Sequence, residues 1–287
     1  MPGSRTRRAM TTRTIQAGRA GAFDALHRSD ELLLLANAWD AISARIIAAA
    51  GFPAIATTSS GVAAAVGYPD GEGAPLDEIV AATARIARAV DVPVTADIES
   101  GFGATASDVA ETIRRIIDAG AVGVNLEDVI YPDGRLFDVP VAAERVRAAR
   151  RAADAEGVPL YLNARTDVFL LKIGEPAGRT AEALRRARAF LDAGASGIFV
   201  PGVVDATTIG ELASEIDAPL NVLAQPGIPS RAELRALGVH RVSLGSSPMR
   251  ATMGFVRTLA AEIRDDPGFA YLERAAIPYT EVNKISR

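Results

Sequence analysis

Two acidic residues at the end of one apolar segment have the types and spacing that metal chemistry requires. Val94 opens an apolar run behind Pro93, and Asp97 and Glu99 close it before the glycine-rich sequence that starts at Gly101. On an extended backbone, residues two apart point to the same side. Two anions on one face of a buried strand repel each other unless a cation or a shared proton relieves them, and carboxylate oxygens suit Mg²⁺ or Mn²⁺. The alternative is a pair of solvated acids in a turn.

Further polar side chains end other apolar segments. Glu127 closes the segment 121–127, and Asn163 and Arg165 close the segment 160–165. An acid from a second strand could complete a metal site, and the planar fork of an arginine suits a substrate carboxylate or phosphonate. In the alternative interpretation, Arg165 only neutralises Glu127. The other strand-end residues that we expect to contact a substrate are Trp39, Ser59, Ser60, Gly61 and Gln225.

Several kinds of chemistry are excluded by what the sequence lacks. It has no cysteine, which excludes a thiolate nucleophile and a cysteine-bound zinc. Its two histidines, His27 and His240, are too few for a histidine-ligated zinc enzyme, and neither of its lysines, Lys172 and Lys284, is convincingly placed for Schiff-base chemistry. The net charge of -4 offers no basic field to nucleic acid, and no apolar run is long enough to span a membrane. We therefore expect a small-molecule partner.

The elements that must position these residues alternate between strand and helix. Helix-like segments rich in Ala, Arg and Glu end in Ala-Gly or Leu-Gly and lead into the next strand. This alternation implies a parallel sheet, and about eight such units predict a single-domain (β/α)₈ TIM barrel of the α/β class. An open doubly wound sheet is the alternative, although no G-x-G-x-x-G motif follows the first strand. The predicted strands are Leu32–Ala36, Ala54–Thr57, Val92–Asp97, Ala121–Glu127, Leu160–Arg165, Gly197–Pro201, Leu220–Ala224 and Arg241–Leu244.

The two ends of the chain fall outside this pattern. Residues 1–20 are rich in arginine and lack the apolar segment of a signal peptide, so we expect a disordered leader on a cytoplasmic protein. Residues 21–264 are expected to form the barrel. Residues 265–287 have no role in a barrel, and we expect this C-terminal helical extension to pack on a neighbouring subunit.

Short motifs along nearly the whole barrel, from about Ala36 to Ile263, resemble those of the isocitrate lyase/phosphoenolpyruvate mutase superfamily. Together, in this order and spacing, these motifs indicate the superfamily more specifically than any single motif does. The resemblance implies a Mg²⁺-dependent barrel that acts on small 2-oxo acids or their precursors, and a homodimer or homotetramer with exchanged helices. The motifs are Ser43-Ala44-Arg45-Ile46, Ser59-Ser60-Gly61, Gly67-Tyr68-Pro69-Asp70, Asp97-Ile98-Glu99-Ser100-Gly101-Phe102-Gly103, Leu126-Glu127-Asp128 and Ala164-Arg165-Thr166-Asp167.

The resemblance also implies roles for single residues. Asp97, Glu99 and Glu127 match the metal-site acids of the family, and Arg165 matches its substrate-anion arginine. Asp70 matches an aspartate that acts near the reacting group in phosphonate-processing members, which makes it the candidate base or nucleophile. Alternatively, Asp70 only shapes the turn in which it lies, where Asp before Gly is common.

Two departures from the family pattern bear on the reaction. Glu99 stands where the family usually has an aspartate. The lyase members carry a loop after strand four whose cysteine is the acid/base, and the mutase has a lysine soon after its Glu-Asp pair. Here the loop 128–137 has no cysteine, and Ile130 stands in about the place of the lysine. The sequence thus argues against the usual isocitrate or methylisocitrate cleavage and against mutase activity.

The favoured function is an enzyme, most simply a lyase, that makes or breaks a C–C or P–C bond beside a 2-oxo acid through a Mg²⁺-stabilised enolate. A phosphonomutase or hydrolase that processes phosphonopyruvate or carboxyphosphonoenolpyruvate is one alternative. A barrel that binds oxo acids without catalysis is another. A sugar-phosphate isomerase would need a glycine-rich phosphate turn, which the segment 243–247 matches poorly.

Overall fold

The apolar runs form strands whose residues are buried on both faces, as a covered parallel sheet requires. The computed structural model describes residues 3–265, 268–270 and 276–286. Every pairing in the main sheet is parallel. Its strands are β1 (Leu33–Leu35), β2 (Asn37–Ala38), β3 (Ile55–Thr57), β4 (Val94–Asp97), β5 (Gly123–Glu127), β8 (Tyr161–Arg165), β9 (Gly197–Val200), β10 (Leu220–Leu223) and β11 (Arg241–Ser243).

The sheet closes on itself through the first strand. β1 pairs with β11, whereas β2 pairs with β3, and only Ala36 separates β1 from β2. These two pieces therefore act as one strand that joins the ends of the sheet. The prediction of an eight-stranded TIM barrel is confirmed, and the open doubly wound alternative is excluded.

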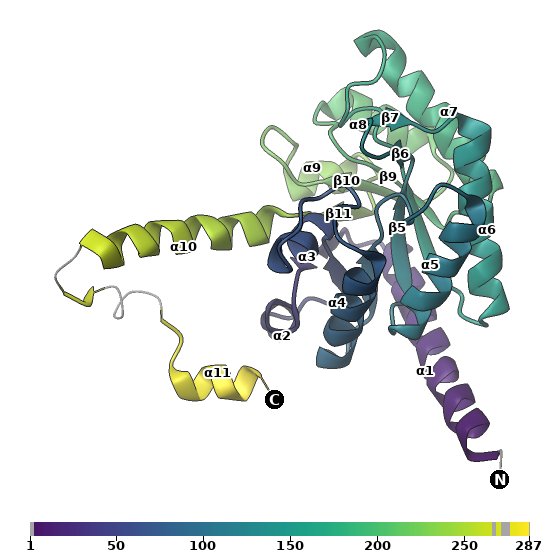
Figure 1. Cartoon of the computed structure of the whole chain (residues 1–287). Coiled ribbons are helices and arrows are strands. Elements are labelled where there is room, and N and C mark those ends of the chain that lie inside the picture. The colour runs from purple at the N-terminus through teal and green to yellow at the C-terminus, as the bar shows by residue number, and fades with distance from the viewer. Residues whose placement is uncertain (1–2, 266–267, 271–275, 287) are drawn as a thin grey trace.

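Helices that follow the strands cover the outside of the barrel (Figure 1). Asp40 caps the first of them by accepting a hydrogen bond from the Ser43 amide, at 2.7 Å. The barrel helices are α2 (Ala41–Ala49), α3 (Ser59–Ala65), α4 (Leu76–Ala89), α5 (Ala106–Asp118), α6 (Val139–Ala155), α7 (Arg179–Asp192), α8 (Ala206–Glu215) and α9 (Arg231–Ala236), and a short 3₁₀ turn, η1 (Pro176–Gly178), precedes α7.

Two connections differ from the prediction. The segment 59–61, which the sequence indicated only as residues at the end of a strand, is the start of helix α3. Gly61 belongs there because a Cβ at this position would lie 2.6 Å from Thr58 and 2.9 Å from Trp39. The expected loop after β5 contains a small antiparallel hairpin of β6 (Val129–Ile130) and β7 (Arg135–Leu136).

The prediction of a disordered leader is wrong for the described part of residues 1–20. Helix α1 (Gly3–His27) occupies this region, and it buries Gln16, Ala20, Phe23 and His27. The His27 ring stacks on Tyr161 with 3.8 Å between ring centroids, and burial lowers the pKa of His27 to about 3. Because Tyr161 begins strand β8, α1 closes the amino-terminal end of the barrel, far from the strand ends where chemistry is expected.

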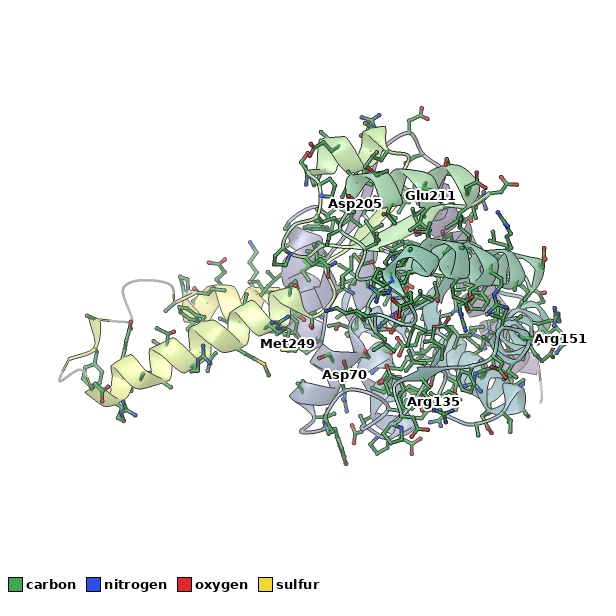
Figure 2. All side chains as sticks on the ribbon, turned by 90° about the horizontal axis from the view of Figure 1, so that it is seen from above. Asp70, Arg135, Arg151, Asp205, Glu211 and Met249 are labelled. Carbon is green, nitrogen blue, oxygen red and sulfur yellow. The ribbon has the colours of Figure 1, made fainter. Side chains whose placement is uncertain are left out.

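The last helices leave the barrel. Helix α10 (Ser247–Asp265), expected as the eighth barrel helix, projects from it, and Met249 at its root is its buried residue (Figures 1 and 2). Helix α11 (Tyr279–Ile285) returns towards α2, where the Arg45 guanidinium donates to the Ile285 carbonyl at 2.8 Å. Parts of the predicted extension 265–287 lie outside the described residues. Among those described, no helix is both long and apolar enough to cross a membrane.

Candidate active site at the carboxyl ends of the strands

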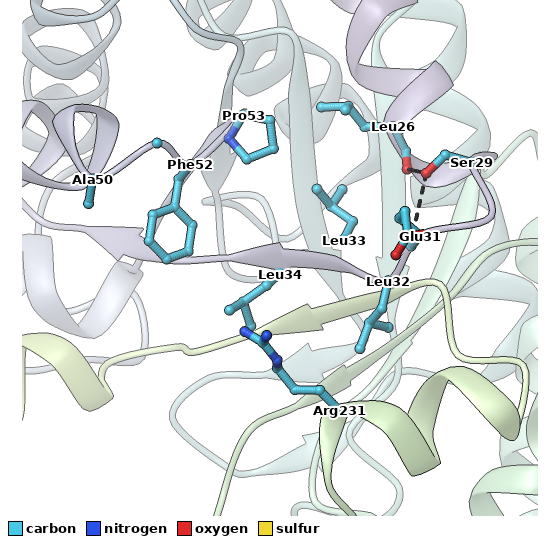
Figure 3. A pocket seen from close by; sticks show the side chains of 11 residues that line it. Leu26, Ser29, Glu31, Leu32, Leu33, Leu34, Ala50, Phe52, Pro53 and Arg231 are labelled. Atoms are coloured by element: carbon cyan, nitrogen blue, oxygen red, sulfur yellow. Dashed lines mark hydrogen bonds between the residues drawn. The ribbon is translucent and has the colours of Figure 1, made fainter.

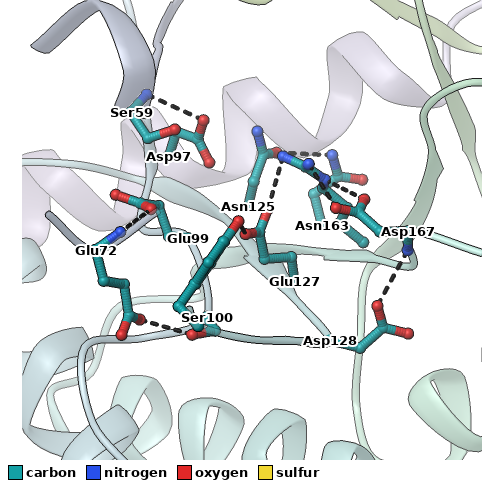
Figure 4. Close-up of polar contacts among 12 residues, drawn as sticks. Ser59, Glu72, Asp97, Glu99, Ser100, Asn125, Glu127, Asp128, Asn163 and Asp167 are labelled. Carbon is teal, nitrogen blue, oxygen red and sulfur yellow. Dashed lines mark hydrogen bonds and ion pairs between the residues drawn. The ribbon is translucent and has the colours of Figure 1, made fainter. Parts of the chain in front are cut away.

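The acids that the sequence places at strand ends meet at one mouth of the barrel (Figure 4). Strand β4 brings Asp97 there, and β5 brings Glu127, which lies opposite Arg165 of β8 in the strand register. Glu99 follows β4 by two residues. These four residues lie at the same mouth, as predicted, because the strand register brings the ends of β4, β5 and β8 to one edge of the sheet.

Asp97 is held by the strand and helix next to it. Its backbone N–H donates to the Thr57 hydroxyl at 2.8 Å, and the Ser59 N–H donates to its Oδ2 at 3.1 Å. Its second oxygen, Oδ1, is buried and has no hydrogen-bond partner. An anionic oxygen removed from water without a partner is costly, so this atom is poised for a cation or a ligand.

Glu99 presents a second such oxygen. Its Oε2 accepts a hydrogen bond from the Glu72 N–H, and its Oε1 is buried without a partner. Burial raises the pKa of Glu99 to about 8, and the nearby charge of Asp97 adds to the rise. Its backbone has φ +49°, a left-handed conformation that is unusual outside glycine.

Glu127 has other partners in this structure. Its carboxylate faces the Arg165 guanidinium at 2.7 Å and accepts the Tyr131 hydroxyl hydrogen bond. Burial raises the pKa of Glu127 well above its usual range, although Arg165 opposes this shift. Arg165 therefore forms an ion pair with Glu127, as one of the two interpretations of the sequence stated.

Arg165 has a second carboxylate partner that the sequence analysis did not single out. Asp167 accepts from its Nε at 2.6 Å and from its Nη2 at 2.7 Å, the bidentate geometry typical of arginine and carboxylate. Burial lowers the pKa of Arg165, but Asp167 and Glu127 outweigh burial, and the pKa ends well above its usual value. The signal was present in the sequence, because Asp167 follows Arg165 at the two-residue spacing that had identified Asp97 and Glu99.

A second arginine, Arg186, is linked to this network through Asp128. The Asp167 N–H donates to Asp128 at 3.0 Å, and the Arg186 guanidinium contacts the other oxygen of Asp128 at 3.1 Å. Burial raises the pKa of Asp128 to about 6, against the opposing effect of Arg186. Arg186 comes from the middle of helix α7, so no strand-end rule could have found it.

Asp70 reaches the same mouth from the connection between α3 and α4. Partial burial raises its pKa, the charge of Asp97 adds to the rise, and the Ser59 side chain hydrogen-bonds its carboxyl. The residue as a whole remains exposed, so solvent screens part of this effect. The candidate base thus lies beside the acid pair, open to solvent.

The expected substrate-contact residues do not all lie at this level. Asn163 lies two register pairs deeper than the Glu127–Arg165 pair, where its amide donates to Asn125 at 2.8 Å and its oxygen is buried without a partner. Ser59 contacts Asp97 through its backbone, whereas Gly61 and Trp39 pack together at the helix start. Ser60 and Gln225 are partly exposed beyond the ends of β3 and β10.

The fit to a metal ion rests on the two unpartnered oxygens. Asp97 Oδ1 and Glu99 Oε1 are hard oxygen donors, and a bound cation would favour the ionised form of Glu99, whose pKa is raised to about 8 without one. Mg²⁺ typically takes one or two carboxylates and keeps several waters. No group of three or more His, Cys, Asp or Glu side chains in the described part of the chain has metal-site geometry. Asp97, Glu99 and Glu127 as metal ligands therefore stay predictions, with unpartnered oxygens on the first two.

A separate pocket lies at the other end of the barrel (Figure 3). It has a volume of about 350 Å³ and lies between the end of α1, strand β1 and the chain before β3. Leucine side chains and Phe52 dominate its lining, which contains none of the strand-end acids. The acids that the expected chemistry requires are at the opposite mouth (Figure 4).

Comparison with known proteins places the chain among barrel enzymes. The family model for phosphoenolpyruvate phosphomutase matches residues 23–264. A functionally uncharacterised protein of Mycobacterium tuberculosis is 34% identical over 261 residues, which are 91% of this chain and 94% of that protein. Oxaloacetate decarboxylase of Ectopseudomonas mendocina is 32% identical and is matched over 78% of this chain and 77% of its own length.

Solved structures agree with this placement. A crystal structure from Burkholderia cenocepacia J2315, assigned provisionally as a phosphonomutase, is 46% identical with a TM-score of 0.81 and covers 86% of this chain and 99% of its own. A phosphonopyruvate hydrolase in complex with oxalate and Mg²⁺ is 26% identical with a TM-score of 0.82, covering 93% and 94% of the two chains. The barrel fold is thus shared with a phosphonopyruvate hydrolase and with a protein assigned provisionally as a phosphonomutase.

Proposed function

The chain belongs to the phosphoenolpyruvate phosphomutase family, within the isocitrate lyase/phosphoenolpyruvate mutase superfamily, and from this membership we propose that it is a Mg²⁺-dependent enzyme that cleaves or forms a C–C bond beside a 2-oxo acid. The observation that carries the proposal is the pair of unpartnered carboxylate oxygens of Asp97 and Glu99 at the barrel mouth. The oxalate and Mg²⁺ of the related hydrolase support it, because oxalate mimics an enolate.

Each residue at the site would have its own role in binding the metal or moving the proton. Asp97 and Glu99 would hold Mg²⁺, with Mn²⁺ as an alternative of the same ligand preference. The bound ion would act as a Lewis acid towards the 2-oxo and carboxylate oxygens and favour the enolate. Glu127 would orient Arg165 and accept hydrogen bonds from water or Tyr131. Asp70, open to solvent beside Asp97, would take or give the proton.

Arg165 can still bind a substrate carboxylate despite its two partners. A guanidinium has five N–H donors. The contacts to Asp167 and Glu127 use three of them, which leaves two for a ligand. Because those carboxylates also fix the plane of the guanidinium, the remaining donors point in defined directions.

The charge at the mouth favours a carboxylate over a phosphonate substrate. Several acids at the mouth lie close enough to influence each other's charge, among them Asp70, Glu72, Asp97, Glu99, Glu127 and Asp167. Arg165 contacts two of them, Glu127 and Asp167. A phosphonate brings more negative charge than a carboxylate and would need more cationic side chains to offset repulsion. A phosphonate reaction remains the second candidate, because structures related by 46% and 26% identity are described as phosphonate enzymes.

The proposed site can be tested before the substrate is known. With Mg²⁺ and oxalate together, we expect the melting temperature to rise, since a ligand at 100 times its Kd stabilises the folded state by about 2.7 kcal/mol. For a chain of this size that corresponds to roughly 5–10 °C. Mg²⁺ alone and oxalate alone serve as controls and should give smaller shifts. No shift with the pair would contradict the site.

A substrate screen then separates the candidate reactions. Oxaloacetate, methylisocitrate and dimethylmalate test C–C cleavage, while phosphonopyruvate and phosphoenolpyruvate test P–C chemistry. Turnover of a phosphonate alone would overturn the preference for a carboxylate substrate. Binding of oxalate without turnover of any compound would favour the non-catalytic barrel.

We also propose that the chain assembles through its projecting helix. Phe255 and Val256 of α10 are 53% and 55% exposed, and Met253 and Ile263 are similarly uncovered, so the helix offers apolar area for a second copy. We expect light scattering at micromolar concentration to give a dimer or tetramer. Phe255→Asp should shift it towards monomer, whereas Thr258→Asp, in the same helix but removing no apolar side chain, should not. A wild-type monomer would contradict the proposal.

A further inference from the structure

The acid pair is covered in this structure. Asp97 and Glu99 are 9% and 2% exposed, so a substrate that contacts them must displace whatever lies above. Part of the cover is the connection between α3 and α4, residues 67–75, which carries Asp70 and Glu72 and is called here the Asp70 loop. What holds this loop in place therefore decides access to the site, provided that the proposed function is correct.

Glu72 joins the Asp70 loop to the segment that follows strand β4. Its carboxylate accepts a hydrogen bond from the Ser100 hydroxyl at 2.6 Å (Figure 4). It also accepts one from the Phe102 N–H at 2.7 Å. Its own N–H donates to Glu99. Hydrogen bonds to a charged group contribute more than neutral ones, and here one residue forms three such links between the two segments.

These links coincide with backbone strain. Glu72, Glu99 and Phe102 have φ values of +58°, +49° and +55°, and within the described residues Lys172 is the other non-glycine position with positive φ. Left-handed conformations of such residues persist where the surrounding contacts fix them, and they cluster at functional sites. The strained positions here are the residues that the Glu72 hydrogen bonds connect.

Neighbouring groups hold both sides of this junction. A Cβ on Gly71, which has φ +82°, would lie 3.1 Å from the Tyr131 ring, so the loop packs closely under that side chain. On the opposite side, the buried Arg145 donates to the carbonyls of Ser100 and Gly103 at 2.6 and 2.8 Å. The segment after β4 is thus fixed to helix α6, whereas the Asp70 loop is fixed to it through Glu72.

We infer that Glu72 is a positioning residue that holds the Asp70 loop closed over Asp97 and Glu99, and that breaking its contacts to Ser100 and Phe102 opens the loop for substrate. Arg145 makes the segment after β4 the fixed partner, and the loop the moving one. Asp70 then reaches its place beside Asp97 only while the Glu72 contacts are intact. Loops that cover a site and complete it on closure are common in enzymes.

Hydrogen exchange of the ligand-free, full-length protein tests this inference without any assay of activity. In Glu72→Ala, we expect amide exchange in residues 67–75 to speed up about tenfold or more, because two hydrogen bonds to a charged group are lost. Glu72→Gln keeps an oxygen acceptor for Ser100 and Phe102 and should restore much of the protection. Glu78→Ala, which removes the same charge from the start of α4, should leave the loop unchanged.

Two further measurements separate positioning from general stability. Ser100→Ala should produce a smaller acceleration and should add little to Glu72→Ala, since both remove the same contact. Since the open loop uncovers Asp97 and Glu99, the Kd of oxalate in the presence of Mg²⁺ should fall or stay within a few-fold of wild type in Glu72→Ala, with the circular dichroism spectrum unchanged. Exchange in 67–75 that matches wild type in Glu72→Ala and Ser100→Ala would overturn the inference. If wild-type protein fails to bind oxalate but the exchange result holds, the proposed function fails and the loop contact stands.

Discussion

Replacing Asp97 with alanine is expected to lower the affinity for Mg²⁺ at least about 100-fold and to remove most activity, because alterations to the surroundings of a metal ligand already cost 10–100-fold. The reason is Oδ1, an oxygen buried without a partner in a carboxyl group whose charge also raises the pKa of Glu99. Calorimetric titration of the folded variant with Mg²⁺, alone and with oxalate, measures the effect.

The controls separate loss of the ligand from loss of structure. Alanine also removes the acceptor of the Ser59 N–H, whereas Asp97→Asn retains an oxygen there and removes only the charge. Both variants should lose Mg²⁺ binding, and Asp97→Asn should keep the wild-type melting temperature more closely. Asp217→Ala, at an exposed acid far along the chain, should change neither property. Unchanged Mg²⁺ binding in both Asp97 variants would rule out this residue as a ligand.

The barrel was predictable from the sequence because burial on both faces leaves a clear signal. Apolar runs such as Gly197–Pro201, several of them preceded by a helix that ends in glycine, correspond to the observed strands. Helix α1 was missed because its arginines dominate its composition. Its buried residues nevertheless recur at helical spacing, at positions 16, 20, 23 and 27, and this pattern would have revealed a helix with one buried face.

The candidate site was predictable to the extent that strand register determines it. Parallel strands bring Asp97, Glu127 and Arg165 to one edge whatever the loops do. The partners that depend on loop conformation were not predictable. Glu72 reaches Ser100 and Glu99 because several backbone positions adopt positive φ, which sequence pattern does not reveal for residues other than glycine.

The departure of α10 has a similar cause. Its sequence satisfies the helix pattern expected of an eighth barrel helix, since alternation predicts the element but not what it packs against. The apolar residues that local pattern assigns to a core, such as Phe255, are uncovered within one chain. The sequence pattern alone does not reveal whether an apolar helix face packs against its own chain or against another one.

Asp70→Asn is expected to lower the catalytic rate by roughly 10²–10⁴-fold, the loss typical of a removed general base or acid. Asparagine preserves the size of the side chain and its hydrogen bonding but takes away its charge and its basicity. Asp70 lies near Asp97 and Ser59, and its raised pKa, caused by partial burial and by Asp97, brings it closer to the range in which a carboxylate can exchange a proton with substrate.

Binding should change much less than rate. Asp97, Glu99 and Arg165 remain to hold the metal and the substrate anion, so the Kd of oxalate with Mg²⁺ in Asp70→Asn should stay within a few-fold of wild type. Asp133→Asn, a loop acid paired with Arg135 on the exposed hairpin, is the matched control and should keep full activity. If Asp70 only shapes its turn, Asp70→Asn will either retain the wild-type rate or lose the fold, and circular dichroism distinguishes these outcomes. A folded variant that binds oxalate normally but turns over at least 100-fold more slowly would leave proton transfer as the role of Asp70, because the metal ligands and the anion site would both be intact.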